Sequence, residues 1–298
     1  MVRPLRPPTA FAVAALGIGL FSVMDAFMKS LTLAIGVYNA LLWRTGISVP
    51  LGLAAWRIEG ARRPDARVLR IHLARGTLAT VMALTFFWGL ARVPMAQAIG
   101  LAYIAPLLAL LMGALFLGER VGRQVVFGSL AALVGVGVIL LGQREAALGH
   151  EAFVGAIAVL VSAVLYAGNL VIARVQSQAA KPGEIAFFQS SIVFTQLLLA
   201  APWLAVLPGA AEWPKLVIGA MLATSSLFLL AWAYAHGEAG YLAMTEYTGF
   251  LYAATLGFLV FGERLSPWTL AGAAIIVAAC LYAARRRDIV QPPLEGVP

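Results

Sequence analysis

Charged residues are scarce in this chain of 298 residues: they make up 11% of it, whereas apolar residues make up 62%. Ordinary soluble domains contain about 25% charged and about 45–50% apolar residues. So little charge cannot cover so much apolar surface in water, which excludes a soluble globular domain and indicates a polytopic membrane protein. The net charge of +8 resides mainly in short loops between apolar segments, so it indicates membrane topology and argues against nucleic-acid binding.

Cysteine and histidine are also scarce. The single cysteine, Cys280, lies in an apolar segment, so the chain has no partner for an internal disulfide. His72, His150 and His236 do not have metal-ligand spacing, and we assign no metal and no other cofactor. The sequence also contains no Ser/His/Asp set and no Walker motif, which argues against an enzyme and against ATP use.

The apolar residues form segments long enough to cross a bilayer, which takes about 20 helical residues. Prolines at segment edges, such as Pro94, Pro182 and Pro267, help to separate ten of them. The predicted spans cover residues 9–35, 38–56, 71–91, 95–117, 124–142, 152–173, 185–207, 214–235, 240–261 and 267–284. The first is too long for a signal-peptide core, and the Pro- and Gly-containing tail, residues 288–298, is expected to be disordered.

Basic residues are distributed unequally between the two sides of these spans. With the N-terminus inside, fifteen Lys and Arg lie on the cytoplasmic side and four on the outer side. The fifteen are Arg3, Arg6, Arg57, Arg62, Arg63, Arg67, Arg70, Arg75, Arg120, Arg123, Arg174, Lys181, Arg285, Arg286 and Arg287; the four are Arg92, Arg144, Lys215 and Arg264. This bias predicts that both termini are cytoplasmic.

A repeated tripeptide divides the chain into two related halves. Gly118-Glu119-Arg120 returns 144 residues later as Gly262-Glu263-Arg264, and each copy follows a long apolar segment. Between residues 97–128 and 241–272, nine of thirty-two aligned positions are identical, where apolar composition alone would give about three. We therefore predict two repeats, residues 1–148 and 149–287, followed by the tail.

Five spans in each half place the second repeat upside down relative to the first. The predicted fold class is an all-α polytopic membrane protein with ten transmembrane helices in two five-helix inverted repeats, related by a pseudo-twofold axis in the membrane plane. This architecture is typical of secondary transporters, in which a site between the repeats opens alternately to the two sides. Channels also contain such repeats, so the architecture alone leaves a pore open.

Three short patterns resemble a known superfamily. Leu115-Phe116-Leu117 and Leu259-Val260-Phe261 precede the two Gly-Glu-Arg copies, and Leu42-Trp43-Arg44 lies in the second span. Together with the topology they resemble the drug/metabolite transporter (DMT) superfamily, its EamA-type family, and the aromatic amino acid exporter group. The resemblance covers nearly the whole chain and implies movement of small metabolites, often amino acids, through a cavity lined by spans 1, 3, 4, 6, 8 and 9. The second half has no arginine in its second span, so a gating role of Arg44 would lack a mirror-image counterpart.

Ionisable residues inside predicted spans are functional candidates, because charge is costly in a bilayer. Asp25 and Lys29 are four residues apart and can pair on one helix face, with Arg44 at similar depth on the next span. They predict either an outer gate or proton coupling, or a static cluster that holds two spans together. Glu246, at a depth comparable to that of Asn169, is the strongest candidate for proton coupling or for binding a substrate ammonium, because a buried carboxylate can hold a proton at neutral pH.

Aromatic residues supply the remaining candidates for substrate binding. Tyr103 and Tyr247 occupy equivalent positions near the middle of spans 4 and 9, and Tyr166 lies three residues from Asn169 on one helix face. Aromatic walls with polar tips suit an amphipathic solute. Trp88 and Trp232 are also equivalent, but they lie near span ends, where interface anchoring is the more common role.

The Gly-Glu-Arg copies are interpreted as architecture. We expect Glu119 with Arg120, and Glu263 with Arg264, to form ion pairs at helix ends that fix the hairpins between spans 4 and 5 and between spans 9 and 10. Exposed pairs of this kind contribute about 0–1 kcal/mol to stability. Gly118 and Gly262 belong to the same structural motif.

The sequence thus predicts a secondary transporter that works by alternating access, an exporter of aromatic or amphipathic amino acids or related compounds. The alternatives are import or export of another metabolite or drug (nucleotide-like, cationic or a vitamin), or a passive channel. Its expected partners are a small-molecule substrate and the lipid bilayer, without nucleic acid. We expect a monomer or homodimer in the bacterial cytoplasmic (inner) membrane.

Overall fold

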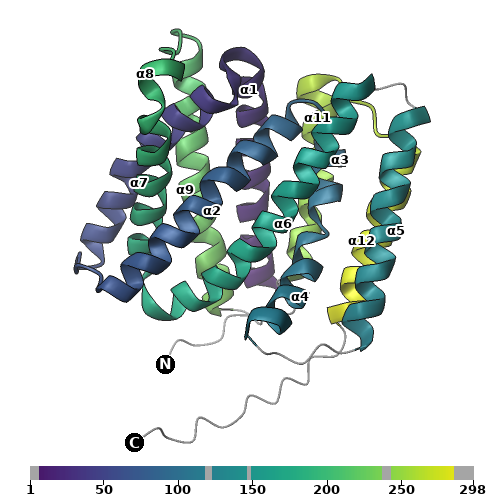
Figure 1. The fold of residues 1–298 in the computed structure, drawn as a ribbon, viewed down its shortest axis with the longest axis horizontal. Helices are drawn as coiled ribbons and strands as arrows, with labels where there is room; N and C mark the ends of the chain where they lie inside the picture. The colour runs from purple at the N-terminus through teal and green to yellow at the C-terminus, as the bar shows by residue number, and fades with distance from the viewer. Residues whose placement is uncertain (1–6, 118–122, 146–148, 237–242, 285–298) are drawn as a thin grey trace, which may run out of the picture.

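The computed structural model is all helical over the residues that it describes, 7–117, 123–145, 149–236 and 243–284 (Figure 1). Its helices are α1 (Pro7–Ile58), α2 (Ala66–Leu90), α3 (Met95–Ala102), α4 (Ala105–Leu117), α5 (Arg123–Glu145), α6 (Gly149–Ala179), α7 (Pro182–Leu199), α8 (Ala201–Leu204), α9 (Glu212–His236), η1 (Ala243–Tyr247, a 3₁₀ helix), α11 (Thr248–Phe261) and α12 (Pro267–Ala284). By length and composition, α1, α2, α6 and α9 can cross a membrane, and shorter apolar helices occupy residues 95–109, 126–142 and 267–282. The predicted all-α class is therefore confirmed.

The first two predicted spans are the two arms of α1, which meet at Gly36. Gly36 has φ 78° and ψ 154°, a non-helical conformation that suits glycine because it has no Cβ. Figure 1 shows α1 reaching one end of the bundle and then returning. We call this end the Gly36 end and the opposite one, at Ile58, the Ile58 end.

Two helices that the sequence predicts to be continuous are interrupted. The fourth predicted span is divided into α3 and α4 at Tyr103 and Ile104. Pro106 explains the break, since it has no N–H to donate to the carbonyl of Ala102 one turn earlier. In the described part of the ninth span, the 3₁₀ helix η1 precedes α11, which starts after Tyr247.

The main packing contacts join the first half of the chain to the second. The helix pairs are α1 with α7 and α9, α2 with α6, α3 with α11, and α5 with α12. Figure 1 shows α5 and α12 side by side at one edge of the bundle, and α1, α7 and α9 together at the other. Small residues permit close approach: a Cβ on Gly135 would lie 2.7 Å from the carbonyl oxygen of Gly272. The two halves therefore interlock, which brings residues far apart in sequence to the same site.

Candidate transport site

The two helix interruptions meet in the interior of the bundle. Tyr103 follows the last residue of α3, and Tyr247 precedes the first residue of α11. Their ring centroids are 5.5 Å apart at an interplanar angle of 82°, and the Tyr103 hydroxyl donates a hydrogen bond of 3.0 Å to the carbonyl oxygen of Glu246. The Cys280 thiol of α12 contacts the carbonyl oxygen of Tyr103 at 3.4 Å. Three elements thus converge on this tyrosine pair.

Glu246 differs from the sequence-based expectation. The prediction of proton coupling assumed a carboxylate buried within a span, but the residue belongs to η1 and is exposed. Its backbone, through the contact with Tyr103, is part of the tyrosine cluster. The reason is local: the 3₁₀ geometry of η1 and its junction with α11 turn Glu246 away from the interior that Thr245, 0% exposed, occupies.

Asn169 and Tyr166 lie on α6, near a buried polar chain that runs toward the Ile58 end. Arg75 of α2 donates hydrogen bonds to the side-chain oxygens of Asn169, at 2.8 Å, and Gln176. Gln176 contacts His72 at 2.7 Å, and the other ring nitrogen of His72 contacts Glu184 of α7 at 3.0 Å. Asn169 is 4% exposed and Tyr166 is 39% exposed. The chain ties α2, α6 and α7 together.

Sequence reasoning missed the role of Arg75, which it counted only as a topology signal. The clue was available, because Arg75 lies inside the predicted span of residues 71–91 and a charge at that position needs a partner. The partners themselves, 94 and 101 residues away, follow from the packing of α2 on α6.

A second polar cluster lies toward the Gly36 end and closes it. The Lys29 ammonium, 4% exposed, donates to the Glu263 carboxylate at 2.5 Å and to the carbonyl oxygen of Val93 at 2.6 Å. The other oxygen of Glu263 accepts from the backbone N–H of Met95 at 2.7 Å. We call these four residues the latch. It joins α1, the α2–α3 connection and the α11–α12 connection across the two halves.

The latch corrects two sequence-based expectations. Lys29 pairs with Glu263, 234 residues away, and not with Asp25 on its own helix. Glu263 in turn is not in a surface pair with Arg264, which is exposed, but reaches inward to Lys29. Gly262 makes this possible: it ends α11 in a left-handed conformation with φ 65°, so the chain turns back and the Glu263 N–H bonds to the Gly257 carbonyl at 3.0 Å. The first copy, Gly118, Glu119 and Arg120, lies outside the described residues.

Asp25 and Arg44 lie next to the latch but are not part of it. Asp25 is 2% exposed, and its Oδ1 atom has no hydrogen-bond partner among the described residues; the same holds for Nε of Arg44. The two charges interact electrostatically. Arg44 also contacts the Met24 sulfur at 3.9 Å and lies 6.0 Å from the centre of the Phe87 ring.

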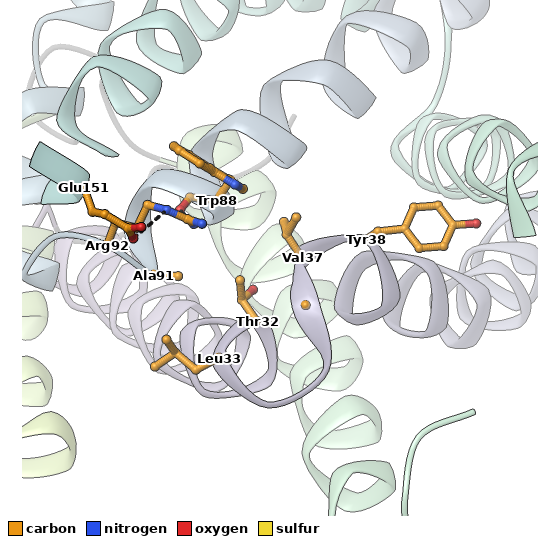
Figure 2. Close-up of a pocket in the computed structure, with 9 residues that line it drawn as sticks. Thr32, Leu33, Val37, Tyr38, Trp88, Ala91, Arg92 and Glu151 are labelled. Atoms are coloured by element: carbon orange, nitrogen blue, oxygen red, sulfur yellow. Dashed lines mark hydrogen bonds and ion pairs between the residues drawn. The ribbon is translucent and has the colours of Figure 1, made fainter. Parts of the chain in front are cut away.

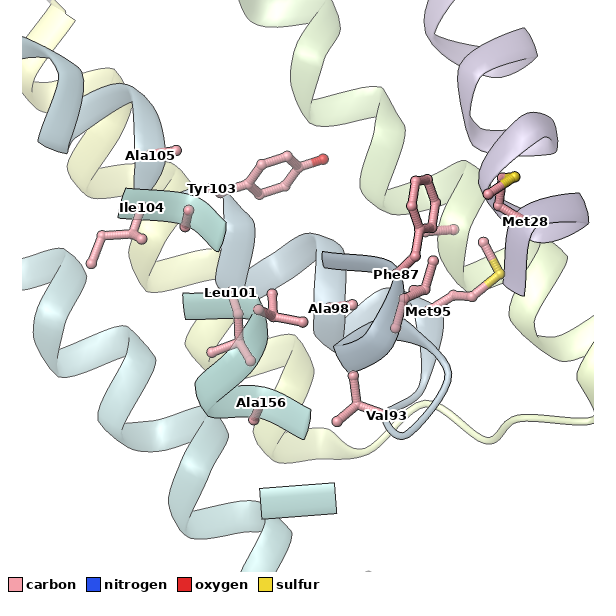
Figure 3. Close-up of a cluster of buried hydrophobic side chains, with 14 of the residues drawn as sticks. Met28, Phe87, Val93, Met95, Ala98, Leu101, Tyr103, Ile104, Ala105 and Ala156 are labelled. Atoms are coloured by element: carbon pink, nitrogen blue, oxygen red, sulfur yellow. The ribbon is translucent and has the colours of Figure 1, made fainter. Parts of the chain in front are cut away.

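Buried apolar side chains lie beside the latch and belong to one cluster that also includes Tyr103. Figure 3 shows Met28, Phe87 and Met95 grouped together, with Tyr103 apart from them. Met28 and Met95 are 0% exposed and Phe87 is 5% exposed. The Gly36 end is thus sealed by an ion pair backed by a tightly packed apolar layer.

An open pocket of about 520 Å³ lies outside this seal. It is lined by Thr32, Leu33, Gly36, Val37, Tyr38, Trp88, Ala91, Arg92 and Glu151 (Figure 2). The Arg92 guanidinium lies 3.6 Å from the centre of the Trp88 ring and 3.7 Å from the Glu151 carboxylate. Trp88 therefore lines a pocket at the end of the bundle, while its repeat equivalent Trp232 lies on α9 and is 38% exposed.

Apolar helices long enough to cross a membrane, interlocking halves and helix interruptions that meet in the interior are features of α-helical membrane transporters. The sequence profile of the EamA-like transporter family matches this chain twice, over residues 9–141 and 153–285. The chain belongs to the EamA-like transporter family. The predicted family and the predicted transport of small metabolites are therefore confirmed.

Proteins similar to this chain are named for several different substrates. A pseudopaline exporter of Pseudomonas aeruginosa is 30% identical over 278 residues, covering 92% of this chain and 95% of the relative. A riboflavin transporter of Rhizobium johnstonii is 30% identical over 89% of this chain and 87% of its own length. A protein of Streptantibioticus cattleyicolor named probable terminal-alkyne amino-acid exporter is 29% identical over 93% of this chain and 89% of its own length. These relatives indicate transport rather than catalysis.

A solved crystal structure supports the fold. It aligns with a TM-score of 0.60 and 24% identity, covering 94% of this chain and the whole of the other. The family and the apolar helices make this chain an integral membrane protein that acts on a small molecule.

Proposed function

We propose that this protein is a secondary exporter of amphipathic amino acids or amino-acid-derived compounds, and that it works by alternating access. Ten membrane crossings form two inverted five-helix repeats, residues 1–148 and 149–287. Both termini lie in the cytoplasm, so the Gly36 end faces outward across the bacterial inner membrane. The positive-inside bias and the two matches to the family profile support this arrangement.

The observation that carries the proposal is the contact between Tyr103 and Tyr247. These residues are 144 positions apart, the same offset as the two Gly-Glu-Arg copies, and each lies at an interruption of its span. Interrupted helices at corresponding positions of two repeats are the strongest indication of a transporter's binding site, because they free backbone groups for a solute. Two aromatic rings with hydroxyl tips suit an amphipathic amino acid.

Names of the relatives support the same substrate class. One relative is named an amino-acid exporter and two are named exporters of pseudopaline. Three relatives are named riboflavin transporters, which makes a vitamin the second candidate. Tyr103 and Tyr247 also offer faces for an aromatic ring system of that kind. Both candidates require a saturable carrier rather than a pore.

Counterflow in proteoliposomes tests the proposal. Vesicles that contain the purified protein and a high internal concentration of L-phenylalanine should accumulate external radiolabelled L-phenylalanine transiently. Protein-free vesicles and vesicles loaded with riboflavin serve as controls. Saturable exchange that phenylalanine drives supports an amino-acid carrier, exchange that only riboflavin drives favours the second candidate, and unsaturated flux refutes a carrier.

Growth measurements test the direction of transport in cells. Expression should raise the concentration of p-fluorophenylalanine that bacteria tolerate, because an exporter lowers the internal concentration of a toxic analogue. Increased sensitivity would indicate import. The variant Tyr247→Ala, which removes one of the two rings, should abolish the protection at equal expression.

Glu246 remains the proposed proton-coupling residue, with a role at the cytoplasmic mouth of the site. Its exposure gives it access to cytoplasmic water while its backbone holds Tyr103. Glu246→Gln should remove the pH dependence of counterflow. If the pH profile is unchanged, another group couples protons or the protein is a uniporter.

Light scattering in detergent will distinguish the proposed monomer from a homodimer.

A further inference from the structure

Asp25 is a buried carboxylate, and the cation nearest to it on α1, Lys29, pairs with another carboxylate. Lys29 lies one turn further along α1, at the i+4 position where an ammonium pairs readily with a carboxylate. In this structure the Lys29 ammonium instead bonds to Glu263 and to Val93. Oδ1 of Asp25 is left without a hydrogen-bond partner in the described part of the chain, at 2% exposure of the residue.

Arg44 presents the opposite charge from the second arm of α1. Its guanidinium and the Asp25 carboxylate interact electrostatically, but no hydrogen bond or ion pair within 4.0 Å joins them in the described structure. Among the described residues, Nε of Arg44 also has no hydrogen-bond partner. The contacts that Arg44 does make, with the Met24 sulfur and the face of Phe87, are weak ones for a guanidinium.

Most of the unsatisfied buried polar atoms belong to two helices of the first half of the chain. Five buried side-chain atoms lack a partner among the described residues, and four of them belong to α1 or α3: Asp25 Oδ1, Thr32 Oγ1, Arg44 Nε and Gln97 Nε2. Buried donors and acceptors are nearly always paired, because leaving one unpaired is costly. A carboxylate and a guanidinium that face the same interior without joining indicate that a third group belongs between them.

We propose that Asp25 and Arg44 bind the ammonium and carboxylate groups of an amino-acid substrate while the Gly36 end is closed, and that Lys29 displaces the ammonium when it opens. This inference rests on the proposed function and names the residues that recognise the polar end of the substrate. The ammonium donates to Asp25, and Arg44 donates to the carboxylate with the fork geometry that suits it.

The exchange of partners by Lys29 links release of the substrate to opening of the Gly36 end. With the end closed, Glu263 holds Lys29, and Asp25 is available to the substrate ammonium. Opening separates Glu263 on the α11–α12 connection from α1, and Lys29 then turns to Asp25 on its own helix face. Two cations compete for one carboxylate, so the substrate loses its ammonium contact on the side where it leaves.

A comparison of ligands tests this site directly. Purified protein in nanodiscs is titrated with L-phenylalanine, with 3-phenylpropionate, which lacks the amine, and with L-phenylalaninamide, which lacks the carboxylate. Wild type should prefer phenylalanine over each analogue by about tenfold or more, as expected for a hydrogen bond to a charged group. Asp25→Asn should lose the preference over 3-phenylpropionate only, and Arg44→Gln the preference over the amide only.

A third variant tests the same site without changing Asp25 or Arg44. Glu263→Gln leaves Asp25 intact but releases Lys29 to compete for it, so phenylalanine binding should weaken about tenfold while 3-phenylpropionate binding is unchanged. Glu151→Gln is the matched control, a carboxylate at the same end with 85% side-chain exposure. It should change neither affinity.

The outcomes separate this inference from the proposed function. If wild type shows phenylalanine counterflow but Asp25→Asn and Glu263→Gln keep the wild-type ratio of the two affinities, the subsite is refuted and the exporter stands. If wild type binds none of the three ligands, the amino-acid substrate class is wrong and the subsite is refuted with it. An equal loss for all three ligands in Asp25→Asn would mean a structural role and would also refute the proposal.

Discussion

The latch makes the most specific prediction, because it joins residues from both halves of the chain in a buried site. Lys29 is 4% exposed, the Glu263 side chain is 16% exposed, and 2.5 Å separates the charged atoms. Removing one member of a buried pair leaves the other charge uncompensated and costs about 3–5 kcal/mol. We therefore expect Lys29→Met and Glu263→Gln each to lower the free energy of unfolding by about that amount.

A double-mutant cycle separates the pair from the rest of its surroundings. The double variant Lys29→Met/Glu263→Gln removes both charges, so it should be more stable than either single variant. The Arg92–Glu151 pair is an internal control, with a separation of 3.7 Å and a Glu151 side chain that is 85% exposed. Its coupling should be about 0–1 kcal/mol. Reversible unfolding in detergent, followed by tryptophan fluorescence, measures both cycles.

The same variants should also open the Gly36 end. Met28 lies next to Lys29 on α1 and is 0% exposed, so a cysteine there is labelled only when this end opens. With Cys280→Ala as background, Met28→Cys should react with a membrane-impermeant maleimide at least about tenfold faster when Glu263→Gln is added, since the lost pair corresponds to more than 1.4 kcal/mol. Additive destabilisation in the cycle together with unchanged labelling would refute the idea that the pair closes this end.

Three further predictions follow from the packing and the polar chain. Gly272→Ala should destabilise the contact of α5 with α12 by about 1–3 kcal/mol, because its Cβ would lie 2.5 Å from a backbone oxygen. Gly137→Ala is the control: its Cβ would meet no atom within 4 Å, so thermal melts should show neutral or increased stability. Tyr103→Phe removes one hydrogen bond and should cost about 1 kcal/mol, measured as stability and as weaker counterflow. Arg75→Met leaves two buried amide oxygens unpaired and should cost about 2 kcal/mol or more, with unchanged stability the contrary result.

Local chemistry explains why some sequence-based expectations fail. The i+4 spacing of Asp25 and Lys29 correctly places them on one helix face, yet a neighbouring residue on a helix is only one of several competing partners. The α11–α12 connection brings a carboxylate to Lys29, and the packing of α1 against α11 makes that contact possible. The Gly-Glu-Arg motif was interpreted as a structural motif that fixes a hairpin. Its second copy instead joins the two halves of the chain, because Glu263 pairs with Lys29.

Helix interruptions were only partly visible in advance. Pro106 inside the fourth predicted span is a known helix breaker, and it lies three residues after Tyr103. The ninth span contains no proline, so its sequence gives no signal for the 3₁₀ helix η1 or for the exposure of Glu246. Tyr103 and Tyr247 were nonetheless singled out as equivalent residues, and the structure brings them into contact.

The sequence alone determined the class of this protein. A chain with 62% apolar and 11% charged residues must be buried in lipid, and its repeated motif indicated two related halves and their family. Composition and periodicity act locally, which is why they suffice for helices and for class. Only the tertiary structure decided which charges meet: Lys29 with Glu263, Arg75 with Asn169, and Asp25 with no protein partner for its buried oxygen among the described residues. These pairings depend on how helices from the two halves pack. The paired residues are 94 to 234 positions apart in the sequence, so only the packing brings them within bonding distance.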